Sequence, residues 1–324
     1  MTRAAAFILA TLVLASPASG DAPKLSIPIN CELGKTCWVQ QYVDRDPSNG
    51  VKDYACGTQS YDGHGGTDIR VRDTASTADV IAAASGTVKA VRDGVEDRLI
   101  RGDADRAAVA DRECGNGVLI SHENGWETQY CHLRHGSVAV KAGDAVTQGQ
   151  KLGSVGYSGM AEFPHVHLSV RQNGKVVDPF RSEEIETQCG EPDNPLWTED
   201  ALAALGYRQS DILALSLAPG AVKMEELEEG LLDAVPSGDW PAMVAYVWAI
   251  NLQKDDTLNI RLDGPEGIAA ENAVTLDRAK AQYLLFAGMK RPAGGWPKGV
   301  YRARVEVSNA GRIRIAKDWQ VTVD

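Results

Sequence analysis

The sequence predicts a mainly β protein made of two units, an antiparallel β-sheet unit followed by a β-sandwich of immunoglobulin-like type. Two observations carry this prediction. Up to Cys189 the apolar residues fall in short, β-branched or alternating runs that are punctuated by glycine and by turn pairs, a pattern typical of antiparallel strands. From Glu191 onward the pattern of apolar residues changes, and longer runs of alternating apolar and polar residues follow. The 324 residues are enough for two domains.

The first twenty residues have the features of a secretory signal peptide. Arg3 supplies a basic start, an apolar stretch covers residues 4–15, and small residues up to Gly20 precede Asp21. The apolar stretch is too short to favour a membrane anchor, and no cysteine follows at once, so a lipoprotein is not expected. We therefore expect cleavage near Gly20 and a first unit that covers residues 21–190.

Six short strands are predicted in this first unit, and hardly any segment reads as a long helix. The turn pairs Asn124-Gly125 and Asn173-Gly174 separate some of them. The predicted strands cover residues 80–83, 86–91, 118–121, 127–132, 151–155 and 166–170.

The second unit is predicted to follow a linker at residues 191–195, which contains two prolines, and to cover residues 196–324. A short helix is expected to begin at Thr198, because Glu199 and Asp200 then lie in its first turn. Alternating strands are predicted at residues 243–251, 257–262, 301–307 and 319–323, with turn signals between them.

This second unit contains no histidine and no cysteine, and no acid and base converge in it. Docking of a protein partner, substrate positioning and simple bulk are the roles open to it. Its tryptophans could form a platform for sugar stacking, but tryptophans in a sandwich more often serve packing. They are Trp240, Trp248, Trp296 and Trp319.

Two histidine motifs predict a metal site. The first is His64-Gly-Gly-Thr-Asp68 and the second is His165-Val-His167, and all six histidines of the chain lie between residues 64 and 167. On a strand, residues i and i+2 share a face, so His165 and His167 should point the same way. A glycine-rich turn after His64 lets the chain fold back toward Asp68. Together the two motifs offer three ligands of imidazole and carboxylate type. Three protein ligands leave a fourth coordination position for water, which is the open arrangement of a hydrolytic zinc site.

The run from His64 to Phe180 resembles the catalytic domain of lysostaphin/LytM-type zinc endopeptidases, which cut peptide cross-links in bacterial cell walls. The resemblance covers about a third of the chain and implies a LytM-like antiparallel sheet. Four pieces occur in the family's order: GHGGTD from Gly63, GNGVLISH from Gly115, YCHL from Tyr130, and GSVGYSG from Gly153 leading into Pro164 and the second motif.

By that resemblance His64, Asp68 and His167 bind one zinc ion per chain, and His132 and His165 are the two catalytic histidines. The implied activity is hydrolysis of peptide bonds by a metal-activated water. His165 is expected to act as general base, and His132 to stabilise the oxyanion or to help proton transfer. The reverse division of these roles is equally open.

Two features stand outside this pattern. The stretch 93–114 is longer and more charged than the family's usual connection, so we expect an exposed loop or irregular hairpin that could border the substrate groove. His122 and His135 belong to no motif, and both are predicted to be structural.

Six cysteines in an exported protein predict three disulfides. Cys31 and Cys37 are close enough for a local loop. For the rest we expect Cys56 with Cys114 and Cys131 with Cys189, although six cysteines allow 15 connectivities. Since neighbouring residues on a strand face opposite ways, Cys131 should face away from the metal if His132 faces it.

Export, disulfides and the resemblance together predict peptidoglycan peptides as the substrate and the periplasm, or else the extracellular space, as the location. The net charge of −11, which becomes one unit more negative when the signal is removed, argues against nucleic acid as a partner. After signal removal no stable membrane insertion is expected.

Two alternatives to the peptidoglycan endopeptidase stay open. One is a non-hydrolytic cell-wall-binding or regulatory module with the same fold, although such relatives usually lack ligand residues and all five positions are present here. The other is a secreted protease that uses the same chemistry on glycine-rich proteins.

Overall fold

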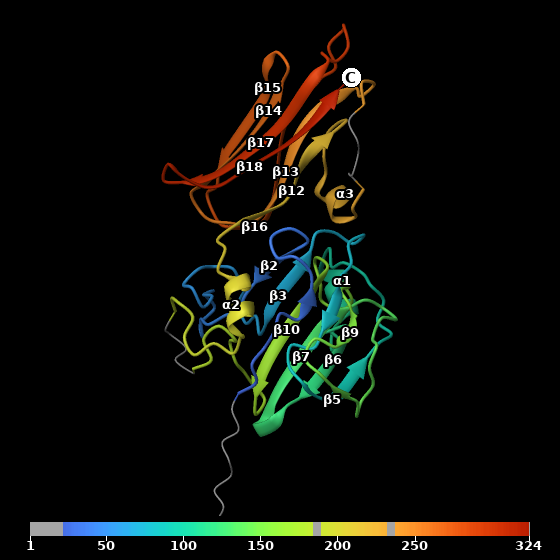
Figure 1. Ribbon diagram of the computed structural model, residues 1–324, viewed down its shortest axis with the longest axis vertical. Coiled ribbons are helices and arrows are strands. Elements are labelled where there is room, and N and C mark those ends of the chain that lie inside the picture. Colours follow the sequence, from blue (N-terminus) through green and yellow to red (C-terminus); the bar gives the residue numbers. More distant parts are fainter. Residues whose placement is uncertain (1–21, 184–188, 232–236, 324) are drawn as a thin grey trace, which may run out of the picture.

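Antiparallel strands make up most of the structure, a computed structural model that describes residues 22–183, 189–231 and 237–323. The predicted mainly β class is confirmed. In Figure 1 the blue to green strands of a first region, residues 22–207, lie below the orange to red strands of a second region, residues 210–323. The predicted signal peptide, residues 1–20, lies outside the described residues. No helix in the described part of the chain is both long and apolar enough to cross a membrane.

One eight-stranded sheet forms the body of the first region. Its strand β10 pairs with β3 on one side and with β7 on the other. Every second side chain of β10 from Val166 to Val170 is buried in the core, so His165 and His167 lie on the other face. In sheet order the strands are β2 (Cys37–Gln41), β3 (Thr67–Val71), β10 (His165–Gln172), β7 (Trp126–Leu133), β6 (Asn116–Ser121), β5 (Gly86–Arg92) and β8 (Ala145–Val146), and β11 (Lys175–Val176) pairs with β10.

A second, three-stranded sheet shares the core of the first region. It consists of β1 (Ile29–Asn30), β4 (Asp79–Ile81) and β9 (Lys151–Ser154). Its apolar side chains Ile29, Val80 and Leu152 pack in the same cluster as Val166. The strands predicted at 80–83, 86–91, 118–121, 127–132, 151–155 and 166–170 are therefore all present, with limits that differ by a few residues.

Helix α2 (Glu199–Leu205) begins where the sequence predicts. Thr198 caps it, because its hydroxyl accepts a hydrogen bond from the N–H of Ala201. Ala201 and Leu205, together with Trp197, pack in the core of the first region. The predicted linker and domain limits remain predictions, but this packing joins residues 196–205 to the first region.

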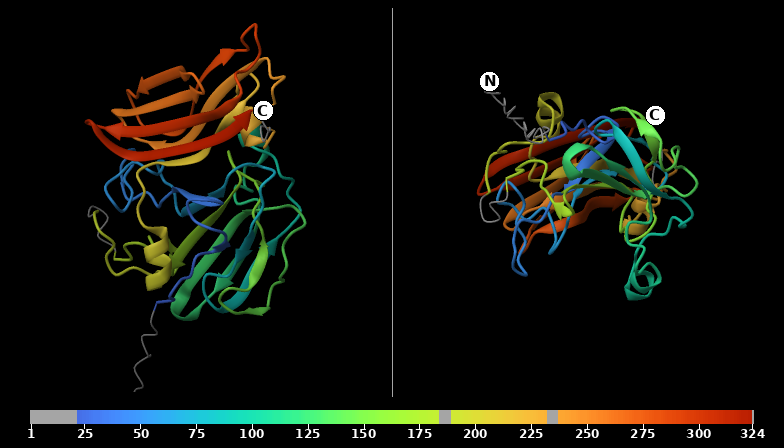
Figure 2. Two further views of the ribbon diagram at one scale, coloured as in Figure 1. Left: turned by 45° about the horizontal axis from the view of Figure 1, so that its top comes forward. Right: turned by 90° about the horizontal axis from the view of Figure 1, so that it is seen from below.

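Two sheets face each other in the second region, as the two layers of strands in Figure 2 show. Side chains such as Val247, Ile260 and Val305 meet in one buried cluster between them. One sheet contains β12 (Asp211–Ala218), β13 (Ala242–Leu252) and β16 (Lys280–Lys290). The other has the order β15 (Gly267–Thr275), β14 (Asp256–Gly264), β17 (Gly299–Asn309) and β18 (Arg312–Val323). Strands β12, β15 and β16 were not among the predicted ones, and the immunoglobulin-like type stays a prediction.

The tryptophans of the second region serve packing. Trp240 and Trp296 are buried in its core, where the indole N–H of Trp296 donates to the carbonyl oxygen of Trp240. Trp319 is half-buried against the same core. Trp248 is fully buried in a separate cluster. Since none of the four is exposed, they do not make a sugar-stacking platform.

The two regions meet over a small apolar cluster of their own. Trp38 of β2 packs there with Tyr246 and Trp248 of β13, and with Leu227 of helix α3 (Met224–Glu228). Beside it the amide group of Gln40 donates to the side-chain oxygen of Asn251 at 3.0 Å. Strands β2 and β3 lie directly below β16 at this junction in Figure 1.

All six cysteines form disulfides, as expected, and the predicted bridge between Cys31 and Cys37 is present. The other two predicted pairings are wrong: Cys56 bonds Cys189, and Cys114 bonds Cys131. The last pair follows from the sheet. Cys114 leads into β6 and Cys131 lies on β7, and these strands are antiparallel neighbours, which brings the two Cα atoms to 4.8 Å.

Candidate metal and catalytic site

Three side chains from distant parts of the chain converge at one edge of the β3–β10 pair. Asp68 lies on β3, His167 lies directly opposite it on β10, and His64 lies on the turn that leads into β3. In the antiparallel register, facing residues share one side of the sheet. The predicted spacing therefore does bring together His64, Asp68 and His167, the only group of this kind in the described residues whose donor atoms could hold a metal ion.

The donor set fits a small divalent ion such as zinc. The Nε2 atom of His64 lies 3.2 Å from Nδ1 of His167 and 3.2 Å from a carboxylate oxygen of Asp68. The other carboxylate oxygen lies 2.8 Å from Nδ1 of His167. A tetrahedron with metal–ligand bonds of about 2.0 Å has edges of roughly 3.3 Å. Two imidazoles and one carboxylate at these separations are thus close to the spacing that such coordination needs.

The protonation states also suit a cation. The Nδ1 atom of His64 lies 2.7 Å from the carbonyl oxygen of Tyr42, which can only accept, so Nδ1 carries the proton and Nε2 keeps its lone pair. Burial would raise the pKa of Asp68, but the three imidazoles around it outweigh that effect and hold the pKa well below its ordinary value. The site therefore presents the Asp68 carboxylate and the Nε2 atom of His64 to the position that they share with His167.

His132 and His165 lie beside this cluster, with their ring centroids 4.5 Å apart. Each donates its Nδ1 proton to a backbone carbonyl at 2.8 Å, that of Ser158 for His132 and that of Phe163 for His165. The Nε2 atom of His165 lies 3.7 Å from a carboxylate oxygen of Asp68. Burial lowers the pKa of both rings, and that of His132 falls well below its usual range. The structure thus brings all five predicted residues together.

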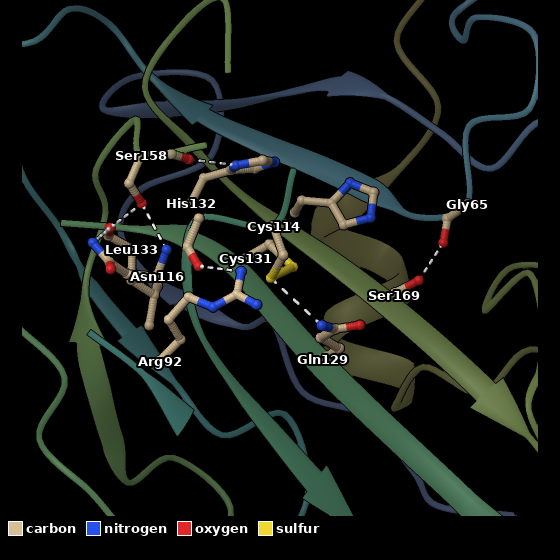
Figure 3. Close-up of a disulfide and its surroundings, with 12 residues drawn as sticks. Gly65, Arg92, Cys114, Asn116, Gln129, Cys131, His132, Leu133, Ser158 and Ser169 are labelled. Carbon is tan, nitrogen blue, oxygen red and sulfur yellow. Dashed lines mark hydrogen bonds between the residues drawn. A yellow bond between two sulfur atoms is a disulfide. The ribbon is translucent and has the colours of Figure 1, made fainter. Parts of the chain in front are cut away.

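The backbone at His132 departs from a regular strand. Its φ of 62° is in the left-handed region, which is uncommon for a bulky residue. Two hydrogen bonds fix this conformation: the N–H of His132 donates to Cys114 at 2.9 Å, and its carbonyl accepts from Gly156 at 3.1 Å. The disulfide between Cys114 and Cys131 closes the same loop (Figure 3).

The prediction that Cys131 faces away from the metal site is wrong. Cys131 lies directly opposite His167 in the register, and facing residues share a side, so both point to the metal face. Strict alternation would turn His132 to the other face. The left-handed backbone breaks that alternation and lets two consecutive residues contribute to the same side.

Ser158 holds the loop that orients His132 (Figure 3). Its hydroxyl donates to the carbonyl of Leu133 at 2.7 Å and accepts from the N–H of Asn116 at 2.9 Å. The next residue, Gly159, must lack a side chain, because a Cβ atom there would lie 2.4 Å from the backbone nitrogen of Gly115. The position of the His132 ring is therefore set by buried hydrogen bonds on two sides.

Comparison with known proteins agrees with this geometry. The profile of Peptidase family M23 matches residues 62–179, the segment that carries all five residues. The chain contains an M23 peptidase domain. The DD-carboxypeptidase/endopeptidase Mpg of Neisseria meningitidis is 43% identical over 65 residues, which are 20% of this chain and 14% of that protein. The peptidoglycan DD-endopeptidase ShyA of Vibrio cholerae is 35% identical over 68 residues, 21% and 15% of the two chains. The alignments thus span about a seventh of these relatives.

The solved structures that are similar to this chain include the catalytic domain of the antimicrobial peptidase lysostaphin from Staphylococcus simulans. It is 21% identical to this chain, and the superposition covers 43% of this chain and 85% of that one with a TM-score of 0.28.

The charged stretch 93–114 of the M23 domain is largely exposed, as predicted, but it contains a short helix that was not expected, α1 (Asp103–Ala108). The stretch is attached to the loop before β10. The N–H of Ile100 donates to Ala161 at 2.9 Å, and Arg106 forms an ion pair with Glu162. The stretch is therefore held next to the loop that leads to His165.

The two remaining histidines lie outside the candidate metal group. Both ring nitrogens of His122 have partners, the carbonyl of Ser85 at 2.8 Å and the hydroxyl of Thr128 at 2.9 Å. His135 is exposed beside Glu96, in the segment that follows β7. Neither belongs to the cluster.

Three neighbours of the M23 site were not predicted. Tyr61 lies with its ring 4.5 Å from that of His64, and Phe163 lies 4.6 Å from the ring of His165. Arg70 lies opposite His165 in the register and is fully buried. Only Arg70 left a signal in the sequence, because a charged side chain two residues after Asp68 must share its face.

Proposed function

We propose that this protein is an exported zinc-dependent endopeptidase that hydrolyses the peptide cross-links of bacterial peptidoglycan. The observation that carries the proposal is the cluster of His64, Asp68 and His167 beside two imidazoles, His132 and His165, whose tautomers are fixed by backbone carbonyls. Three ligands and two adjacent bases are the parts that hydrolysis of an amide needs.

In the proposed mechanism His64, Asp68 and His167 hold the zinc ion. When bound, zinc supplies Lewis-acid polarisation of the scissile carbonyl and lowers the pKa of water toward 7. His165 removes the proton of the attacking water at Nε2, since its Nδ1 already donates to Phe163. The protonated ring then donates to the departing amine.

The tautomer of His132 favours one of its two predicted roles. With Nδ1 donating to Ser158, the neutral ring offers Nε2 only as an acceptor. It can therefore take part in proton transfer, and it can donate to an oxyanion only after it has gained a proton. We infer that His132 assists proton transfer while His165 is the general base. If the two histidines exchanged these roles, the residual rates of His132→Ala and His165→Ala would be exchanged as well.

Peptidoglycan as the substrate is supported by the similarity to ShyA, a peptidoglycan DD-endopeptidase. Export to the periplasm is supported by three disulfides, which persist in oxidising compartments. A non-hydrolytic module is disfavoured because all five residues meet with suitable geometry. A protease for glycine-rich proteins would use the same site, and only the substrate distinguishes it.

The test is metal content together with muropeptide release from purified cell walls by the full mature chain. We expect about one zinc per chain and new uncross-linked muropeptides. His165→Ala should retain the zinc and release none. A chain that binds zinc but cuts only glycine-rich protein would favour the secreted protease, and a chain without zinc would contradict the proposal.

A further inference from the structure

Arg70 is a fully buried cation on β3, between the metal site and the second region. It shares its side of the strand with Asp68 and lies opposite His165. Among the described residues no carboxylate lies within ion-pair distance of its guanidinium. The carboxylates of Glu228 and Asp73 act on this charge from a greater distance. A buried charge without a counter-ion in contact costs free energy unless its donors are satisfied by other acceptors.

Neutral acceptors from both regions satisfy the guanidinium instead. The Nη1 atom donates to the side-chain oxygen of Gln40 at 3.0 Å and to that of Gln282, on β16 of the second region, at 3.1 Å. The Nη2 and Nε atoms donate to the backbone carbonyls of Arg72 and Val71. Because Arg has a rigid, planar fork of donors, these contacts fix the plane of the group.

Two aromatic rings lie near the guanidinium group. The ring of Phe163 lies 4.8 Å from the guanidinium carbon, and the ring of Trp248, on β13 of the second region, lies 5.0 Å from it. Both distances are within the range of cation–π attraction. The indole N–H of Trp248 donates to Gln282 at 3.1 Å, so the two contributions of the second region support each other.

Phe163 connects this cluster to the catalytic base. Its ring packs against His165, and its carbonyl oxygen accepts the Nδ1 proton of His165 at 2.8 Å. A shift of Phe163 therefore moves both the plane of the imidazole and the group that fixes its tautomer.

We propose that Arg70 is a positioning residue through which Trp248 and Gln282 of the second region hold His165 in its working orientation. This inference rests on the proposed function for its effect on turnover. The second region then has a definite role, which is to support His165 through Arg70. This role does not require the second region to bind a ligand.

The experiment compares Trp248→Leu with Trp248→Phe in the full mature chain. Both lose the indole N–H and some volume, but only Phe keeps an aromatic face over Arg70. With a soluble cross-linked muropeptide, Trp248→Leu should lower kcat roughly tenfold, since small misplacement of a reacting group is costly. KM and zinc per chain should not change, and Trp248→Phe should recover most of kcat.

Gln253→Met is the matched control at the same junction. Gln253 contacts Thr58 of the first region at 3.4 Å and does not touch Arg70, so this variant should keep the wild-type kcat. Equal losses in Trp248→Leu and Trp248→Phe, or a loss expressed in KM or zinc content, would overturn the positioning role.

The ¹H–¹⁵N signal of the His165 Nδ1–H group provides a readout that does not depend on turnover. We expect it to shift or exchange faster in Trp248→Leu and to be unchanged in Gln253→Met. If the wild-type chain cuts no muropeptide, the proposed function fails, and this signal alone then decides the positioning role. An unchanged signal in Trp248→Leu would overturn it.

Discussion

The two regions of the molecule differ in what they bury. The first region buries imidazoles and the Asp68 carboxylate at one sheet. Its strands are connected by irregular loops, and three disulfides cross-link the region. The second region buries long apolar strands and fewer polar side chains, of which Glu228 and Asn251 bond Arg101 and Gln40 of the first region. Buried polar groups are costly, so their concentration in the first region supports the proposal that the chemistry takes place there.

Asp68→Asn should have the largest effect and would show that the first region supplies the ligands of the metal. Loss of the carboxylate removes one of three ligands, so we expect loss of zinc and a fall in muropeptide release of at least about 100-fold, beyond the ~10–100-fold typical of outer partners. Zinc analysis and the release assay measure this. Retention of zinc in Asp68→Asn and in His64→Ala would refute the ligand assignment.

Leu258→Ala tests whether the core of the second region contributes to stability and not to turnover. Leu258 is fully buried in the core of the second region, so we expect a loss of about 2–5 kcal/mol in the free energy of unfolding. Below the melting temperature, kcat should stay within about twofold, because the residue lies outside the junction cluster. A large drop in kcat for a folded protein would mean that the two regions are coupled throughout.

The double variant Cys114→Ser/Cys131→Ser removes the bridge that closes a 17-residue loop beside His132. We expect a loss of about 3 kcal/mol in stability, together with a lower kcat, because the left-handed backbone of His132 loses a constraint. The matched control is Cys31→Ser/Cys37→Ser, whose loop spans six residues and does not touch the site. Denaturant unfolding and kinetics compare the two, and equal kcat values would contradict the role given to the bridge.

Thr198→Ala should have the smallest effect and sharpens the limit between the regions. Removal of the helix cap costs about 1 kcal/mol, and α2 packs on the first core. The loss should therefore appear in the unfolding transition that releases zinc. If it appears only in a transition that leaves the zinc bound, residues 196–205 belong with the second region.

The sequence was most informative where chemistry depends on local spacing. The turn before Asp68 and the alternation in β10 predicted that His64 and Asp68 meet and that His165 and His167 share a face, and the resemblance then singled out His167 as the third ligand. The predicted strands of both regions followed from the same kind of alternation. The cap at Thr198 was equally local.

The errors concern pairings that only the complete sheet decides. The partner of Cys131 depends on the β6–β7 register, and the side chosen by His132 depends on a positive φ that no residue pattern announces. Strand β15 contains three alanines, and β16 contains alanine, lysine, leucine and methionine, all of which favour helices. Their extended form is imposed by packing between the sheets.

The alternation of β10 also links formation of the candidate site to folding of the sheet. The residues that seal the core and the residues that face the metal are neighbours on one strand, and their partners come from a strand about a hundred positions earlier. Pairing of strands so distant along the chain slows folding. The unfolded chain therefore carries no assembled cluster, and the proposed activity requires the closed sheet.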